Sequence, residues 1–128
     1  MGDVEFLWVG IGGFVGANAR YVLGQFIGNR LGTSFPYGTF IINITGAFII
    51  GLVLTTLTER TIADPLWRQL LVVGFLGGYT TFSSYTFEAV QLFEAGDWQL
   101  ATLYLIGSNL LGLLACVAGL VLARNIGT

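Results

Sequence analysis

The stretch that decides the fold is GGYTTFSSYTFE, residues Gly77 to Glu88, which places glycines, hydroxyl groups and aromatic rings inside an otherwise apolar, uncharged segment. Gly77 and Gly78, followed by the β-branched Thr80 and Thr81, predict a break in a helix. In lipid, such a break frees backbone groups that need protein, water or an ion as partners. Two readings stay open: the freed carbonyls hold a hard cation such as Na⁺, or the break is a kink that aids packing.

The composition is that of a membrane protein. The chain has 128 residues, of which 55% are hydrophobic and only 9% are charged, whereas soluble domains have about 25% charged residues. Five basic residues, all arginine, stand against seven acidic ones, and there is no histidine. This balance offers no basic face for nucleic acid and excludes imidazole chemistry. The single cysteine, Cys116, lies in an apolar run and is expected to serve packing.

Long uncharged stretches separate the charged residues, and each is long enough for one membrane span. A bilayer core needs about 20 mostly apolar residues per helix. The predicted spans cover residues 6–27, 39–58, 69–93 and 99–123, with a break in the third near 77–81. The sequence therefore predicts an all-α integral membrane protein with four transmembrane helices in one domain, residues 1–128.

One alternative concerns the first span, because an apolar run followed by Ala17-Asn18-Ala19 is also typical of a signal peptide with its cleavage site. The residues before this run include Asp3 and Glu5 but no basic residue. A signal peptide begins with a positively charged region, so a membrane span is favoured.

The arginines predict only a slight preference for one orientation in the membrane. The two sides of the predicted topology carry Arg60, Arg68 and Arg124 on one side, and Arg30, with Arg20 if it lies near a span end, on the other. Orientation follows such a bias, so either a weak single orientation or insertion both ways is expected. Insertion both ways would allow an antiparallel homodimer with a two-fold axis.

Small residues at a spacing of four are frequent in the predicted spans. This spacing allows close helix packing, either within one subunit or between subunits. The pairs are Gly12/Gly16, Gly24/Gly28, Ala47/Gly51, Gly74/Gly78, Ser108/Gly112 and Ala115/Gly119. Because four packed helices fill their own interior, a pathway for a solute would have to form between subunits.

Three of the predicted spans carry pairs of polar or aromatic side chains on one helical face. The pairs are Thr39 with Asn43, Phe82 with Tyr85, and Tyr104 with Ser108. Each pair alone would more often serve packing or an interhelical hydrogen bond. Together, hydroxyl and amide donors and the positive edges of aromatic rings could replace the hydration shell of a small anion while binding it weakly. The convergence therefore favours a permeant anion.

Two charged residues lie within the predicted spans. Arg20 either attracts anions to a vestibule or extends to the end of its helix. Glu88 lies near the far end of the third span, where an interfacial location and a pathway role are both open. The first three spans have no acidic residue at mid-membrane, which argues against a proton-coupled exporter of organic cations.

These motifs resemble those of the Fluc family of fluoride channels. GFLGGYTTFSSY, Gly74–Tyr85, resembles the third-helix motif G-x-x-G-G-x-T-T-F-S-T-F. YGTFIINITG, Tyr37–Gly46, resembles the second-helix motif G-T-x-x-x-N-x-x-G, and GIGGFVGANAR, Gly10–Arg20, resembles the first-helix pattern G-x-x-x-G-x-x-x-R. The resemblance extends through essentially the whole chain.

The resemblance implies a fluoride-selective channel of the cell membrane, not an enzyme, that passively exports F⁻ and is surrounded by lipid. It implies a dual-topology antiparallel homodimer with two pores. The residues that it assigns are Asn43 as a donor to fluoride, Phe82 and Tyr85 as ring edges, Thr39, Tyr104 and Ser108 as a polar track, and Arg20 at a vestibule. It also implies that the main-chain carbonyls of Gly77 and Thr80 bind a structural Na⁺ at the dimer centre.

One position departs from the pattern, because Tyr85 lies where the family usually has Phe, so that a hydroxyl is added in the expected pore. Two other functions fit the length and hydropathy of the chain. One is a small multidrug-type transporter that works by alternating access, and the other is a membrane assembly subunit that transports nothing.

Overall fold

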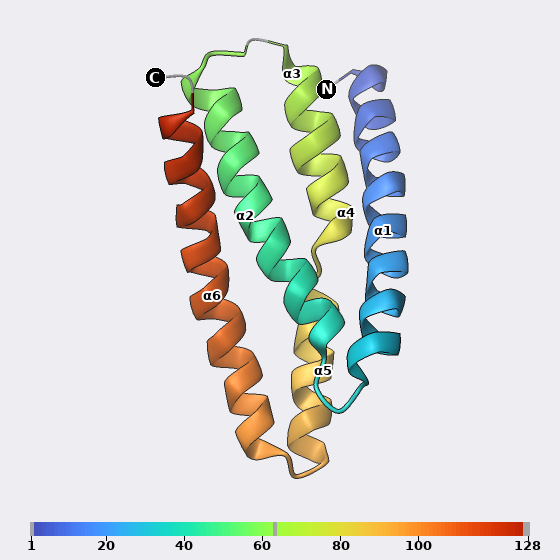
Figure 1. Ribbon diagram of the computed structural model, residues 1–128. Coiled ribbons are helices and arrows are strands. Elements are labelled where there is room, and N and C mark those ends of the chain that lie inside the picture. The colour runs from blue at the N-terminus through green and yellow to red at the C-terminus, as the bar shows by residue number, and fades with distance from the viewer. Residues whose placement is uncertain (1, 63, 127–128) are drawn as a thin grey trace.

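The computed structural model describes residues 2–62 and 64–126, and within these ranges every regular element is a helix. Three long helices dominate the fold (Figure 1): α1 (Asp3–Leu31), α2 (Tyr37–Glu59) and α6 (Trp98–Asn125). Each of the three is long and apolar enough to cross a membrane. The prediction of an all-α membrane protein is therefore confirmed for these helices.

The remaining helices lie between α2 and α6 in the sequence, and in space they follow one another end to end (Figure 1). They are α3 (Pro65–Trp67), the π-helix η1 (Arg68–Leu76), α4 (Gly77–Tyr79) and α5 (Phe82–Glu94). Helical geometry stops after Tyr79 and resumes at Phe82, so two extended residues, Thr80 and Thr81, interrupt the series. The sequence placed its break in the same part of the chain.

Local signals set the helix ends. Asp3 and Glu5 lie in the first turn of α1 and Arg30 in its last, where their charges oppose the helix dipole. The helix stops at Gly32, whose φ of 83° is in the left-handed region that suits glycine. Asp64 accepts a hydrogen bond from the Leu66 backbone N–H at 3.0 Å and so starts the turn of α3.

Close packing at glycines holds the helices together in two groups. On α1, a Cβ atom at Gly12 would overlap the Leu70 carbonyl oxygen, and one at Gly16 would overlap the Phe75 carbonyl oxygen of η1. Between α2 and α6, a Cβ at Gly51 would overlap the Cys116 carbonyl oxygen. These small-xxx-small spacings therefore serve helix contacts within one chain. The sequence alone had left contacts within one subunit and contacts between subunits equally open.

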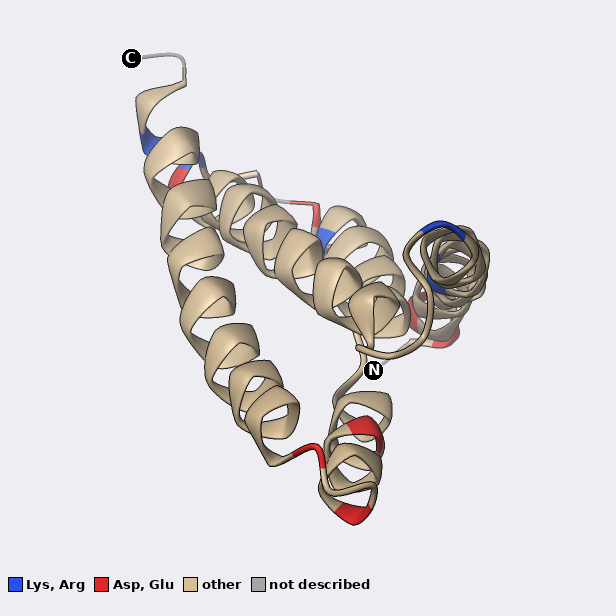
Figure 2. Cartoon of the chain, turned by 60° about the horizontal axis from the view of Figure 1, so that its bottom comes forward, with Lys and Arg blue, Asp and Glu red and all other residues tan. Residues whose placement is uncertain are grey.

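The charges lie mainly at the helix ends, and most of α2 and α6 carries none (Figure 2). Where these two helices end, Arg124 forms an ion pair with Glu59 at 2.7 Å, and Arg60 donates a hydrogen bond to the Ala123 carbonyl at 3.0 Å. Two charged residues are exceptions among those that the structure describes, because Arg20 is half-buried well inside α1 and Glu88 is half-buried inside α5. Glu88 carries no positive charge, and Arg20 lies away from both helix ends. It therefore adds nothing to the arginine bias between the two ends.

Candidate functional site

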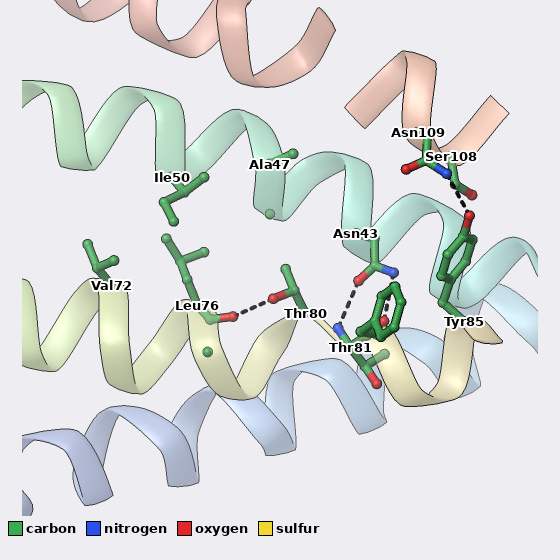
Figure 3. Close-up of a pocket in the computed structure, with 13 residues that line it drawn as sticks. Asn43, Ala47, Ile50, Val72, Leu76, Thr80, Thr81, Tyr85, Ser108 and Asn109 are labelled. Carbon is green, nitrogen blue, oxygen red and sulfur yellow. Dashed lines mark hydrogen bonds between the residues drawn. The ribbon is translucent and has the colours of Figure 1, made fainter. Parts of the chain in front are cut away.

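An open groove of about 430 Å³ lies beside the interruption of Thr80 and Thr81 (Figure 3). Residues from α2, η1, α4, α5 and α6 line it, and its polar side chains are Asn43, Thr80, Thr81, Tyr85, Ser108 and Asn109. Gly77 and Phe82 line it as well. The groove thus brings together most of the residues that the sequence predicts for an ion site.

Asn43 of α2 bridges the interruption. Its Oδ1 accepts a hydrogen bond from the Thr81 backbone N–H, and its Nδ2 donates to the Thr81 carbonyl oxygen, both at 2.9 Å (Figure 3). The side chain therefore replaces the helical partners that Thr81 lacks. Since an amide nitrogen carries two hydrogens, one N–H of Asn43 is left to donate elsewhere.

The last turn before the interruption exposes carbonyl groups. The Leu76 carbonyl accepts hydrogen bonds from the backbone N–H and the hydroxyl of Thr80, at 3.0 and 2.8 Å. Arg20 Nε donates to the Gly78 carbonyl at 3.0 Å. Within residues 2–62 and 64–126, no hydrogen bond reaches the carbonyls of Gly77 or Thr80. Two main-chain oxygens are thus left to bind water or a cation.

Arg20 reaches the interruption from α1, and its side chain contacts the backbone there instead of extending to the end of its own helix. A guanidinium at the C-terminal end of a helix is favourable, since the carbonyls at that end carry partial negative charge. The resemblance placed Arg20 at a vestibule, and that role stays a prediction.

Aromatic rings form a row along α5 and α6. The ring of Phe82 is 75% exposed at the groove, with its centroid 5.9 Å from that of Tyr85. Tyr85 is buried, and its ring lies 5.1 Å from the Tyr104 ring with an interplanar angle of 63°. Aromatic rings therefore lie next to the polar side chains of the groove, and the contact of a ring edge with an anion stays a prediction.

Two buried hydroxyls in this region have no ordinary hydrogen bond. Within the described part of the chain, neither the Tyr104 hydroxyl, on a fully buried side chain, nor the buried Ser108 hydroxyl has a partner within hydrogen-bond geometry. Leaving a buried polar group without a partner costs about 1–3 kcal/mol. The Ser108 hydroxyl is thus available to water or an anion, and so is the Tyr104 hydroxyl, which lies beside Thr39 but outside hydrogen-bond geometry.

Thr39 lies apart from the groove. Its hydroxyl donates to Glu88 at 2.7 Å, and both residues line a second cavity of about 600 Å³ near the loop between α1 and α2. Tyr104 lies close to Thr39 and Glu88, so it stands between the groove and this cavity. The predicted residues Thr39, Tyr104 and Ser108 therefore follow one another from the cavity to the groove.

The sequence reasoning missed Asn109. Its Nδ2 donates to the Tyr85 hydroxyl and to the Leu105 carbonyl, both at 2.8 Å. An amide inside a predicted span, next to Ser108, was a signal for a polar contact, because such a group needs partners in lipid. No cluster of three or more acidic, Cys or His side chains suitable for a metal occurs in the described residues, so a cation here would need main-chain ligands.

The apolar helices, and a groove that gathers six polar side chains at a helix interruption, are those of a multi-pass integral membrane protein. The chain belongs to the family described as CrcB-like protein, Camphor Resistance (CrcB), whose sequence model matches residues 7–120. The resemblance seen in the motifs is thereby confirmed.

Curated relatives cover almost the whole chain. A protein of Koribacter versatilis named "Fluoride-specific ion channel FluC" is 49% identical over 122 residues, which are 95% of this chain and 97% of the relative. Proteins of the same name from Acidobacterium capsulatum and Solibacter usitatus are each 46% identical, over 96% and 95% of this chain and 98% and 100% of theirs. The similarity therefore includes every part of the groove.

Proposed function

We propose that this chain is a fluoride-selective channel that lets F⁻ leave the cell passively. The observation that carries the proposal is 49% identity, over nearly the full length, to a protein named as a fluoride-specific channel. The groove supports it, since its free donors are neutral and would hold a small anion only weakly. A negative-inside potential favours anion exit by about 2.3 kcal/mol per 100 mV. No enzymatic step is needed.

The proposed path runs past the donors on α2 and α6 and the ring edges on α5. Asn43 contributes its remaining N–H, and Phe82 contributes the edge of its exposed ring. The unpartnered hydroxyls of Tyr104 and Ser108 continue the path toward Thr39. The Thr39 hydroxyl donates to Glu88, so it could donate to the anion only after this hydrogen bond breaks.

The cation part of the proposal rests on the free carbonyls at the interruption. Na⁺ takes oxygen ligands, as the unwound helices of transporters provide. The carbonyls of Gly77 and Thr80 have no other partner among the described residues, and both residues line the groove. Two carbonyls are too few to complete the coordination shell of a cation, so a second copy of the chain would supply further ligands.

The proposed assembly is an antiparallel homodimer in which the segment from Pro65 to Glu94 makes the third of four crossings of the membrane. A polar groove open on one side would face lipid in a single chain, where unsatisfied backbone carbonyls are unfavourable. A second copy placed on the groove would cover it and complete two equivalent paths. The end arginines, three at one end and Arg30 at the other, differ by two positive charges, a difference small enough to be compatible with insertion both ways.

A multidrug-type transporter is less well supported, because none of the described residues that line the groove is acidic and could exchange a proton for a cation. The three functions are separated by two assays in liposomes: release of fluoride, and uptake of an organic cation with and without a pH gradient. A channel releases fluoride without a pH gradient and takes up no organic cation. Saturable uptake of the cation driven by the pH gradient, without fluoride release, would indicate a transporter, and the absence of both activities would indicate an assembly subunit.

A further inference from the structure

We propose that Asn109 is a positioning residue of the anion path. Its amide holds the Tyr85 hydroxyl against α6, which withdraws that hydroxyl from the groove as a donor and fixes the Tyr85 ring against Tyr104. This inference rests on the proposed channel function. It concerns the hydroxyl that distinguishes Tyr85 from the phenylalanine expected at this position.

The hydrogen bonds around Tyr85 use every available hydrogen. Asn109 Nδ2 donates one hydrogen to the Tyr85 hydroxyl and the other to the Leu105 carbonyl, each at 2.8 Å. The Tyr85 hydroxyl donates its own hydrogen to the same Leu105 carbonyl at 3.3 Å. Figure 3 shows Tyr85 reaching from α5 to Asn109 and Ser108 on α6. The set is closed, and only oxygen lone pairs of Tyr85 and Asn109 remain for the groove.

A closed set has a consequence for the anion. Lone pairs repel an anion, whereas the hydroxyl of Ser108, the neighbour of Asn109 in the groove, is an unused donor. The arrangement therefore directs an anion toward Ser108 and Tyr104 and away from Tyr85. It also holds the Tyr85 ring in its edge contact with the Tyr104 ring, which carries the next free hydroxyl.

Removing one member of the pair should disturb the path more than removing both. Tyr85→Phe leaves one Asn109 N–H without its acceptor, so this N–H becomes an extra donor at the groove that retains the anion. Asn109→Leu leaves the Tyr85 hydroxyl without its strongest partner, so the ring is free to shift. The double substitution replaces both partners by apolar groups, an exchange that can be nearly neutral.

The test is a double-mutant cycle on the full-length protein in liposomes, with fluoride efflux, the fluoride-to-chloride permeability ratio and thermal unfolding measured for each variant. Each single substitution is expected to lower fluoride efflux about fivefold, the effect of roughly 1 kcal/mol, and to shift the permeability ratio. The double variant should return to within about twofold of the original efflux. Asn18→Leu is the matched control, since Asn18 is exposed and its Nδ2 donates to the Phe14 carbonyl within its own helix, away from the groove.

Coupling in thermal unfolding, together with coupling in efflux and in the permeability ratio, supports the proposal. Coupling in unfolding alone, with efflux and ratio unchanged, overturns the positioning role, because the pair is then only structural. Additive effects on unfolding overturn the Tyr85–Asn109 contact itself. If the unsubstituted protein releases no fluoride, both the channel function and the positioning role are wrong. The double-mutant cycle in thermal unfolding still shows in that case whether the Tyr85–Asn109 contact exists.

Discussion

Asn43 is the side chain whose loss should disturb the site most. Asn43→Leu keeps the approximate size of the side chain but removes both hydrogen bonds to Thr81, each 2.9 Å long. The Thr81 N–H and carbonyl would then lie unpaired and half-buried beside the interruption. At about 1–3 kcal/mol for each unpaired group, the substitution should destabilise the fold by roughly 2–6 kcal/mol.

Asn43→Asp separates the structural effect from the effect on the anion. A carboxylate still accepts from the Thr81 N–H, but it cannot donate, and its charge repels an anion. We expect this variant to remain more stable than Asn43→Leu in thermal unfolding and to lose fluoride efflux at least as completely. Two results would refute the reasoning: Asn43→Leu as stable as the original protein, or Asn43→Asp with unchanged efflux from liposomes.

Three further predictions address other parts of the account. Tyr104→Phe removes a buried hydroxyl without a partner, so stability in thermal unfolding should rise or stay unchanged while fluoride efflux falls about tenfold. A loss of stability would show that the hydroxyl is hydrogen-bonded. Gly12→Ala should destabilise the protein by about 2 kcal/mol or more in thermal unfolding, because the added Cβ would overlap the backbone of η1. Gly28→Ala, at a position with open space around it, should have no such effect, and equal effects would contradict the packing of α1 against η1. Arg20→Gln should lower the apparent affinity for Na⁺, measured as the rise of the unfolding temperature with sodium concentration, because Arg20 holds the Gly78 carbonyl in place. An unchanged affinity would show that Arg20 does not contribute to the cation site.

The sequence predicts the membrane helices and the interruption because both depend on local chemistry. A run of apolar residues favours a membrane helix, and a Gly-Gly-x-Thr-Thr sequence favours a break in it, whatever the rest of the fold. The partners across the fold do not follow from such patterns. Arg20 and Gly78 are 58 positions apart, and no local signal predicts that a guanidinium meets that carbonyl.

The glycine spacings show the same limit. A pair such as Gly12/Gly16 predicts close approach of a second helix, but it does not say whether that helix belongs to the same chain. Only the arrangement of α1 against η1 decides it. Similarly, the π-helical form of Arg68–Leu76 has no distinct sequence signature.

The most direct test of fluoride selectivity compares two anions. Purified protein is reconstituted in liposomes that contain either potassium fluoride or potassium chloride, and valinomycin is added to relieve the charge imbalance. A fluoride-selective channel predicts rapid release of fluoride and retention of chloride. Retention of both anions by folded protein, or equal release of both, would contradict the account.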